Sequence, residues 1–260
     1  MKYLKKFENH TEYEEARQNL ILPNVSLCTQ ENKVHYNPIE TRLVGTFNVT
    51  DTSQPTRILW GASGFTEIEI DGVKQSSVAI DYQFSTVGEH IVKYTLTDPT
   101  IIGKQAFAGA NALVGVIIPN GVTSIDFQAF VSTSLTSVTI PNSVRSIGTY
   151  AFVGCSGLTE VTIPDSVASI GDNAFESCSG LTSITIPDSV TSIGFAAFRN
   201  CGNISTITSH IMNAPSVNGG TFQGVKNGGT LYVPIGSSGY ETWMNDQGNL
   251  GYHNWVKVEQ

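Results

Sequence analysis

The chain has 260 residues, of which 40% are hydrophobic and only 14% are charged, which is enough for two or three domains with a hydrophobic core. Its formal net charge of −8 argues against nucleic-acid binding, because that function needs a basic stripe along the phosphates, and against docking on anionic lipid. No run of about 18 apolar residues occurs, so we expect no membrane insertion.

Residues 1–38 are expected to form a charged N-terminal arm with one short helix. Thr11 and Glu14 match a capping box, which predicts a helix from about Glu12 to Leu20, and Pro23 ends it. The first residues include cations but no apolar stretch behind them, so we identify no signal peptide. Either the chain is not exported by that route or a leader has been removed. We interpret the arm as a docking element that attaches the protein to a larger assembly.

Three short stretches of the arm also carry a resemblance. They are Phe7-Glu8-Asn9-His10-x-x-Tyr13, Val25-Ser26-Leu27-Cys28 and Val34-x-Tyr36-Asn37. Together they resemble the leading segment of structural proteins from phages of Bacteroides-type hosts. The resemblance implies a virion protein, for which a signal peptide is unnecessary.

Residues 39–98 are expected to form a small all-β domain. Ile68 and Ile70 alternate with polar residues just before Asp71-Gly72, a strong hairpin signal. Two further alternating runs are interpreted as strands, separated by a turn at Gly88. Their apolar residues are Val78, Ile80, Tyr82 and Phe84 in the first run and Val92, Tyr94 and Leu96 in the second. The sheet is expected to open with Leu43, Phe47 and Val49.

The second half of this domain has a recognisable pattern. The run Tyr82-x-Phe84-Ser85-Thr86-x-Gly88-x-His90-x-Val92-x-Tyr94-x-Leu96 resembles the closing strands of bacterial immunoglobulin-like or PKD-like domains. The resemblance implies a small β-sandwich. Since no Gly/Ser-rich linker follows it, we expect a rigid junction with the next domain.

A repeating unit of about 23 residues fills residues 99–208. Its prolines recur at 141, 164 and 187, and its phenylalanines at 107, 130, 152, 175 and 198. A period in this range with apolar residues at set offsets is typical of a leucine-rich-repeat solenoid, whose stacked coils share one core. We therefore predict a mainly β fold, in which a leucine-rich-repeat solenoid follows a small β-sandwich-like domain and an N-terminal helical arm.

One repeat illustrates the expected packing. Its inward residues are expected to be Leu158, Val161, Ile163, Val167, Ile170 and Phe175, while Thr159, Glu160 and Thr162 face solvent. Pro164 should end the strand, because proline cannot donate to a ladder, and Asp165-Ser166 should form a turn. Gly171 is expected to permit a tight bend, followed by a short helical or 3₁₀ turn at Ala174-Phe175.

The repeats closely resemble those of the BspA-like (Treponema-type) leucine-rich-repeat family. The pattern is carried by Ile186-Pro187-Asp188-Ser189-Val190-Thr191-Ser192-Ile193-Gly194 and Ala197-Phe198-x-x-Cys201. The resemblance covers about 110 residues. It implies a relation to bacterial and protist surface proteins that bind host matrix or other cells, and to proteins encoded in gut-bacterial prophages.

Residues 209–260 are expected to form a C-terminal cap. The repeat pattern decays here, with Phe222 and Leu231-Tyr232-Val233-Pro234 as drifted echoes. A terminal repeat must close the open end of the core, and large aromatic side chains do this well. The aromatic residues of this stretch are Tyr240, Trp243, Tyr252 and Trp255. We expect them mainly in the cap core, with stacking on sugars as the alternative.

No residue group indicates catalysis, a cofactor or a metal. Cys155, Cys178 and Cys201 recur at one repeat position and are interpreted as a buried ladder of thiols, although neighbouring coils could bring two of them to disulfide distance. Asp165 and Asp188 share a turn position and could mimic a glycosidase pair, but Asn or Asp after proline is an ordinary turn former. The five histidines are scattered.

The exposed side of the strands offers rows of hydroxyl groups instead. Such rows could bind a glycan, a protein or ordered water as in ice-binding solenoids, or they could be a solvated β surface. Glu160 interrupts one row, which argues against ice binding. The candidate binding residues are Thr139, Thr159, Glu160, Thr162, Thr182, Ser183, Thr185, Thr206 and Thr208.

We therefore predict a non-catalytic adhesion or recognition protein of a virion or a bacterial cell surface. Its repeat face is expected to bind a host protein or glycan, while residues 1–38 join a larger assembly, with a homo-oligomer as one form of it. The first alternative is a purely structural virion decoration or fibre component without a ligand. The second is a polysaccharide-active enzyme.

Overall fold

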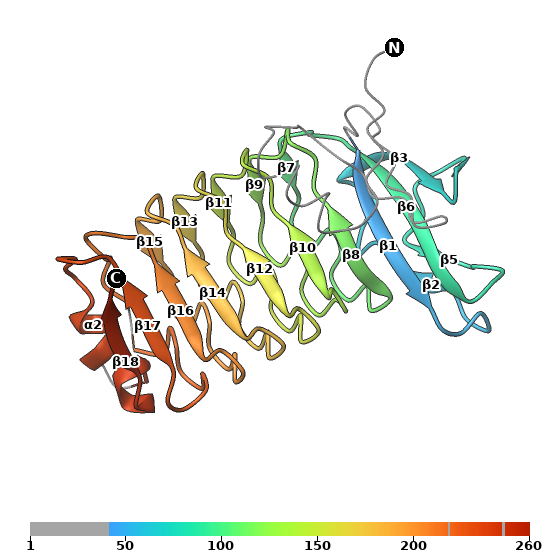
Figure 1. The fold of residues 1–260 in the computed structure, drawn as a ribbon. Coiled ribbons are helices and arrows are strands. Elements are labelled where there is room, and N and C mark those ends of the chain that lie inside the picture. The colour runs from blue at the N-terminus through green and yellow to red at the C-terminus, as the bar shows by residue number, and fades with distance from the viewer. Residues whose placement is uncertain (1–41, 218, 246–247) are drawn as a thin grey trace, which may run out of the picture.

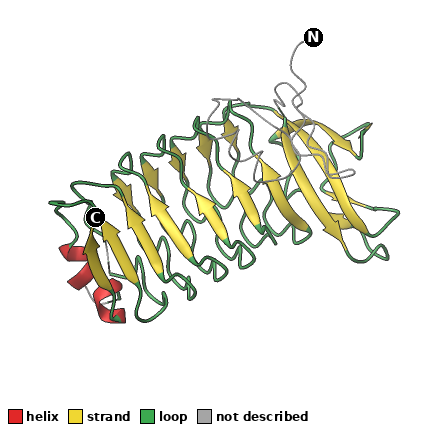
Figure 2. Ribbon diagram, viewed as in Figure 1, coloured by secondary structure: helices red, strands yellow, loops and turns green. Residues whose placement is uncertain are grey.

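The computed structural model describes residues 42–217, 219–245 and 248–260, which form one elongated slab of stacked coils (Figure 1). The first described strands of the chain lie at one end of the stack, and the short helical elements of the C-terminal cap lie at the other end (Figure 2). The expected N-terminal arm, its helix and its phage-like motifs lie outside the described residues, as does Cys28.

The large sheet runs the whole length of the slab. Its strand order is β18-β17-β16-β14-β12-β10-β8-β1-β6-β3-β4. The strands of its solenoid part are β8 (Leu113–Ile117), β10 (Ser137–Thr139), β12 (Glu160–Thr162), β14 (Ser183–Ile186), β16 (Thr206–Ser209), β17 (Thr230–Val233) and β18 (Val256–Glu259). All of these pair in parallel, because every coil enters the sheet in the same direction.

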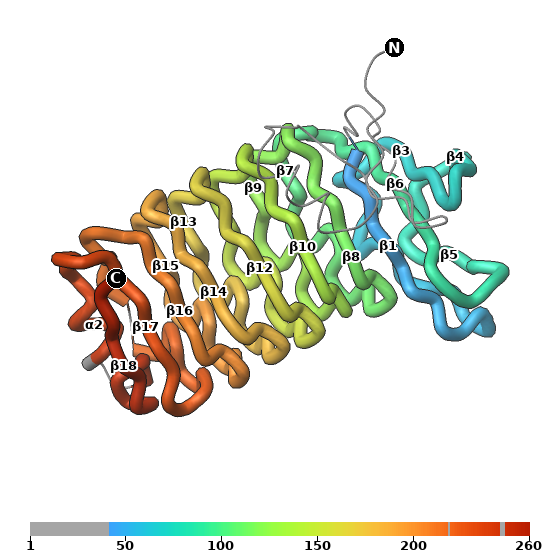
Figure 3. The backbone as a smooth tube through the Cα atoms, viewed as in Figure 1, coloured from blue at the N-terminus to red at the C-terminus, as the bar shows by residue number. Residues whose placement is uncertain are grey.

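A second, five-stranded sheet forms the other side of the slab, in the order β15-β13-β11-β9-β7. Its strands are β7 (Ile101–Ile102), β9 (Ser124–Ile125), β11 (Ser146–Ile147), β13 (Ser169–Ile170) and β15 (Ser192–Ile193). From β7 to β16 the chain thus alternates between the two sheets, whereas β17 and β18 belong to coils without a strand in the second sheet (Figure 3). The second residue of each of these strands is an isoleucine that points into the core, and Ile125 is fully buried.

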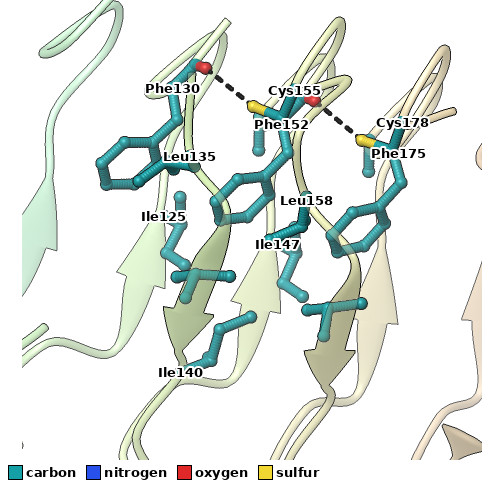
Figure 4. Close-up of a cluster of buried hydrophobic side chains, with 14 of the residues drawn as sticks. Ile125, Phe130, Leu135, Ile140, Ile147, Phe152, Cys155, Leu158, Phe175 and Cys178 are labelled. Carbon is teal, nitrogen blue, oxygen red and sulfur yellow. Dashed lines mark hydrogen bonds between the residues drawn. The ribbon is translucent and has the colours of Figure 1, made fainter. Parts of the chain in front are cut away.

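A column of phenylalanine rings fills the space between the two sheets. Phe107, Phe130, Phe152, Phe175, Phe198 and Phe222 are all fully buried. Successive ring centroids lie 5.2, 5.2, 5.3, 5.4 and 5.8 Å apart, and the planes of neighbours differ by no more than 6°. The expected inward residues of the repeat are confirmed, since all six are at least 96% buried. Figure 4 shows how the rings stack above the strand residues.

The turns that carry these rings are laddered as regularly as the strands. The Phe152 N–H donates to the carbonyl of Ala174 at 2.8 Å, and the Phe175 N–H repeats this contact to Ala197 one coil later. The expected short turn at Ala174-Phe175 is present, since the Ala174 N–H donates to the Gly171 carbonyl three residues back at 3.3 Å, but it does not continue into a helix. Asn173 just before it has φ 55°, and a left-handed residue cannot continue a right-handed helix.

The described N-terminal part extends the large sheet with antiparallel strands. These are β1 (Leu43–Val49), β3 (Phe65–Ile70), β4 (Val73–Lys74) and β6 (Gly88–Leu96), while β2 (Thr56–Arg57) and β5 (Asp81–Tyr82) form a separate two-stranded sheet. The hairpin at Asp71-Gly72 is confirmed, with φ values of 49° and 82°. β1 pairs with both β6 and β8, so it joins this part directly to the solenoid.

One expected strand of this part is wrong. The alternating run from Val78 to Phe84 forms only the two-residue strand β5, which pairs with β2 and not with β6. Ile80 is 39% exposed, while Phe84 is buried against the ring of His90. The partner expected beside β6 is supplied from elsewhere in the chain, because β1 and β3 already occupy both edges of β6.

The C-terminal part continues the stack before closing it. Phe222 adds a sixth ring to the column, and β17 and β18 add two more strands in register. The cap itself contains α2 (Glu241–Asn245) and the 3₁₀ helix η1 (Leu250–His253). Trp243 is fully buried and lies 5.3 Å from the ring of Phe222, so it covers the end of the column. Trp255 and Tyr240 are also buried, whereas Tyr252 is 71% exposed.

Candidate functional site

The outward side of β10, β12, β14 and β16 is a flat face made almost entirely of hydroxyl side chains. Period-2 alternation produces it, since Val138, Val161, Ile184 and Ile207 turn into the core and their neighbours turn outward. Ser137 pairs with Glu160, and Ser183 pairs with Thr206. Thr139 pairs with Thr162, Thr162 with Thr185, and Thr185 with Thr208. We call this surface the hydroxyl face.

Parallel pairing fixes the spacing of the rows. Adjacent strands of a sheet lie about 4.8 Å apart, so each row repeats at about that distance along the slab. Seven of the eight side chains are Ser or Thr, and the eighth, Glu160, carries the face's one charge. The expected rows are therefore brought together on one face, and Thr159 and Thr182 lie exposed beside them at the strand starts.

The hydroxyl groups of these rows are unengaged. Within the described ranges, none of the seven hydroxyls makes a hydrogen bond to the protein. The exposed Thr159 differs slightly, because its hydroxyl donates to the Thr136 carbonyl at 3.5 Å. A face of free donors and acceptors must be satisfied by solvent or by a ligand.

Hydroxyls at the strand starts are bonded on both sheets. On the second sheet the Thr191 hydroxyl donates to the Ala168 carbonyl at 3.1 Å, and Thr123 donates to the Thr100 carbonyl at 3.1 Å. On the large sheet Thr136 makes the same contact to the Val114 carbonyl at 3.1 Å. The unbonded hydroxyls of the large sheet are thus the ones within the strands, on the outward side of the hydroxyl face.

The hydroxyl face reaches further than sequence reasoning placed it. In register, Thr206 is followed by Thr230 and Thr208 by Tyr232 on β17. Both side chains are half-buried, and both continue the outward rows. The sequence signal for this extension was the repeat-like stretch Leu231-Tyr232-Val233. In the structure Leu231 and Val233 are buried and Tyr232 is half-buried, as in the earlier strands.

The thiol column is confirmed as a set of free, buried cysteines. Cys155, Cys178 and Cys201 are fully buried and unbonded. Each Sγ donates to the carbonyl of the phenylalanine in the preceding coil, at 3.2, 3.1 and 3.1 Å, and Figure 4 shows the bonds of Cys155 and Cys178. Burial raises the pKa of the Cys201 thiol to about 12. These cysteines therefore act as small apolar residues that also satisfy a backbone acceptor.

The remaining candidates do not assemble into a reactive centre. Asp165 and Asp188 are exposed at the turns, where sequence reasoning placed them. Among the described residues, no cluster of three or more His, Cys, Asp or Glu could hold a metal ion. No helix in the same residues is long and apolar enough to cross a membrane. His90 is buried in the N-terminal part, where its Nδ1 contacts Asp71 at 2.7 Å.

These features define a class of protein: a solenoid of about 23-residue coils with a proline-stopped strand, a phenylalanine column and a laddered turn. The particular family follows from the repeat sequence. The chain belongs to the family of the BspA type leucine rich repeat region, which matches residues 81–228 in six copies.

Several solved structures are similar to the chain. A leucine-rich repeat protein from Bacteroides ovatus shares 28% identity, with a TM-score of 0.49, over 65% of this chain and 42% of that one. The leucine-rich repeat protein of T. pallidum shares 26% identity, with a TM-score of 0.47, over 56% and 69%. The pneumococcal vaccine antigen PcpA shares 20% identity, with a TM-score of 0.49, over 62% and 39%. The chain therefore spans less than half of the B. ovatus protein. A search of the curated proteins finds no match.

Proposed function

We propose that this protein is a non-catalytic recognition protein whose hydroxyl face adheres to a host protein or glycan. The observation that carries the proposal is the in-register rows of the hydroxyl face. Seven outward Ser and Thr hydroxyls stand on four adjacent strands, and none of them bonds to the protein within the described ranges. Membership of a repeat family supports the same role, because solenoids present extended surfaces to their partners.

The chemistry of the face suits an uncharged, extended ligand. Ser and Thr hydroxyls both donate and accept, so they can match the hydroxyls of a sugar chain or the amides of a polypeptide. The ordered strands beneath hold them in fixed positions, which lowers the entropy lost on binding. Glu160 adds one acceptor with charge near the centre of the rows.

The test is binding to a glycan array and to host cells, with paired variants. Changing Thr162 and Thr185 to Lys would place two long cations in the middle of the hydroxyl face. The matched control changes Ser169 and Ser192 to Lys, in the same two coils but on the opposite sheet. We expect the first pair to lower binding at least tenfold and the control pair to keep it.

Other outcomes would favour the alternatives. If neither the array nor the cells retain the wild-type protein, the structural role as a decoration or fibre component becomes the better account. If the protein cleaves a polysaccharide and Asp165→Asn abolishes the cleavage, the enzymatic role does. Equal loss in the face variants and in the control would show only a damaged fold, which circular dichroism would reveal.

We further propose that the protein works at a bacterial surface or on a virion, attached through residues 1–38. The charged composition of that arm and its motifs, set beside a solenoid poor in charged residues, support this reading. Removing residues 1–38 should release the protein from its carrier while leaving ligand binding intact. A pull-down in which the shortened chain still joins the assembly would contradict the role of the arm.

A further inference from the structure

Strand β18 is an open edge of the large sheet and the longest edge strand in the described sheets. The other edges, β4, β7 and β15 among them, are strands of two residues, whereas β18 has four. All four of its residues, Val256 to Glu259, are exposed. An edge of this kind presents unpaired backbone groups that can accept another strand.

The orientation of the backbone groups on this edge is set by β17. The N–H of Val256 donates to the Gly229 carbonyl at 3.0 Å, and that of Gln260 donates to the Val233 carbonyl at 2.9 Å. Because amides alternate in direction along a strand, the N–H and C=O groups of Lys257 and Glu259 point away from β17. Those two residues are the ones through which a further strand would bond.

The side chains divide by face in the same alternating way. Lys257 and Glu259 pair in register with the buried Leu231 and Val233, so they lie on the core-facing side at the end of the slab. Val256 and Val258 pair with Thr230 and Tyr232 on the outward side and are 59% and 36% exposed. The outward row thus changes from hydroxyl to aliphatic at the edge strand.

We propose that β18 is the dimerisation strand of this protein and that it pairs antiparallel with β18 of a second copy about a two-fold axis at Val258. In this register, Lys257 of each copy lies opposite Glu259 of the other. Both residues point their backbone groups outward, so they form the hydrogen-bonded pairs of the ladder. Val258 meets its own symmetry mate at the non-hydrogen-bonded position, where side chains approach most closely.

Charge decides both the partner and the register. An axis at Lys257 would oppose two lysines, and an axis at Glu259 would oppose two glutamates, which is unfavourable across strands. Within one copy the Lys257 ammonium lies 3.2 Å from the Glu259 carboxylate, and a neutral foreign strand would add no counter-charge to either group. Charged side chains on an edge strand are a common device against unwanted pairing. A second copy supplies both counter-charges, because a two-fold interface uses the same surface twice.

Exposed apolar side chains border the strand and add to the surface of the contact. Tyr252, four residues before β18, is 71% exposed. Ile235 is 73% exposed. The N–H of the adjoining Gly236 donates to the Glu259 carboxylate at 3.3 Å, so Ile235 lies near the C-terminal end of β18. The two-fold axis is perpendicular to the sheet, so the hydroxyl faces of both copies lie on the same side and can bind one extended ligand together.

The test is the mass of the full chain in solution, by light scattering during size-exclusion chromatography. The wild type should run at twice the 27.9 kDa of one chain. Lys257→Glu alone opposes glutamates to glutamates, and Glu259→Lys alone opposes lysines to lysines. Each variant should be monomeric, with dimer affinity lowered at least tenfold. Lys226→Glu, an equal change of charge at an exposed site of the same end, should stay dimeric.

Mixing the two single variants provides the decisive measurement. Each strand of one then faces a strand of opposite charge in the other, so the mixture should restore a dimer that contains one copy of each. The double variant Lys257→Glu with Glu259→Lys should also dimerise. A wild type of single-chain mass at high concentration would overturn the proposal. So would single variants that remain dimeric, or a mixture that stays monomeric.

Discussion

At the scale of single residues, the phenylalanine column carries much of the stability. Phe175 is fully buried between rings 5.3 and 5.4 Å away, so Phe175→Ala would leave a cavity that the laddered backbone cannot close. We expect it to cost about 3–5 kcal/mol in the free energy of unfolding, measured by urea denaturation. Phe195→Ala is the matched control, since that ring is 45% exposed and should cost much less.

Left-handed residues form a second regular feature of the turns. Gly109, Ser132, Gly154, Ser177, Asn200 and Gly224 occupy one turn position, with φ between 55° and 76°. An L-residue is strained there, and glycine is not.

Substitutions at this position test that strain. Ser177→Gly should stabilise the fold, by up to about 1 kcal/mol after the extra freedom of the unfolded chain is subtracted. Gly154→Ala should destabilise it by about the same amount. Thermal unfolding measures both, and opposite signs are the expected result. Changes of the same sign would contradict the strain.

The thiol column predicts a pH dependence of stability. Burial raises the pKa of Cys201 to about 12 from its ordinary value of 9.0. Above pH 9 the unfolded chain releases this proton while the folded protein keeps it, so stability falls as pH rises from about 9 to 12. Relative to Cys201→Ala, the wild type should lose about 2 kcal/mol between neutral pH and about pH 10.5. If the free energy of unfolding changed with pH in the same way in both proteins, the raised pKa of Cys201 would be refuted.

At the scale of elements, the coils approach so closely that only glycine fits between some turns. A Cβ on Gly194 would lie 2.4 Å from the Asp172 backbone nitrogen, and one on Gly171 would lie 2.6 Å from that of Thr149. The expected tight bend at Gly171 is thus better understood as room for the neighbouring coil.

The same contacts give a prediction for the coil interface. Gly194→Ala forces adjacent coils apart and should cost about 1–3 kcal/mol, which chemical denaturation can measure. Gly202→Ala is the control, because its nearest contact, the Gly224 carbonyl, lies at 3.7 Å. Similar losses of stability in both variants would show that the replacement of glycine itself, and not the close approach of the coils, decides the effect.

At the scale of the whole molecule, one sheet connects the N-terminal part with the solenoid. Leu113 in β8 is fully buried at this junction, where β8 pairs with β1 and β10. In a stack of nearest neighbours, damage at one coil weakens both sides. Leu113→Ala should therefore reduce the hydrogen-exchange protection of β6 and of β12 together. Val73→Ala, at an exposed site in β4, should change neither. If protection were lost in only one of these two strands, the N-terminal part and the solenoid would be independent folding units.

The sequence alone determined the repeat, its inward residues and its outward rows. Those features depend on local rules: alternation along a strand, proline at its end and a constant period that returns each side chain to the same place. Phe152, Phe175 and Phe198 could be assigned to one column because equal spacing in the chain becomes stacking in space. The drifted echoes at Phe222 and Leu231 could be recognised for the same reason.

Only the tertiary structure decided what depends on contacts between distant parts of the chain. The run from Val78 to Phe84 alternates as well as any strand, yet β1 and β3 take both sides of its expected partner. Sequence periodicity also cannot tell free hydroxyls from bonded ones, since that depends on which acceptor the neighbouring coil brings near. Local chemistry repeats with the sequence, whereas sheet edges, junctions and unsatisfied groups arise when the coils pack.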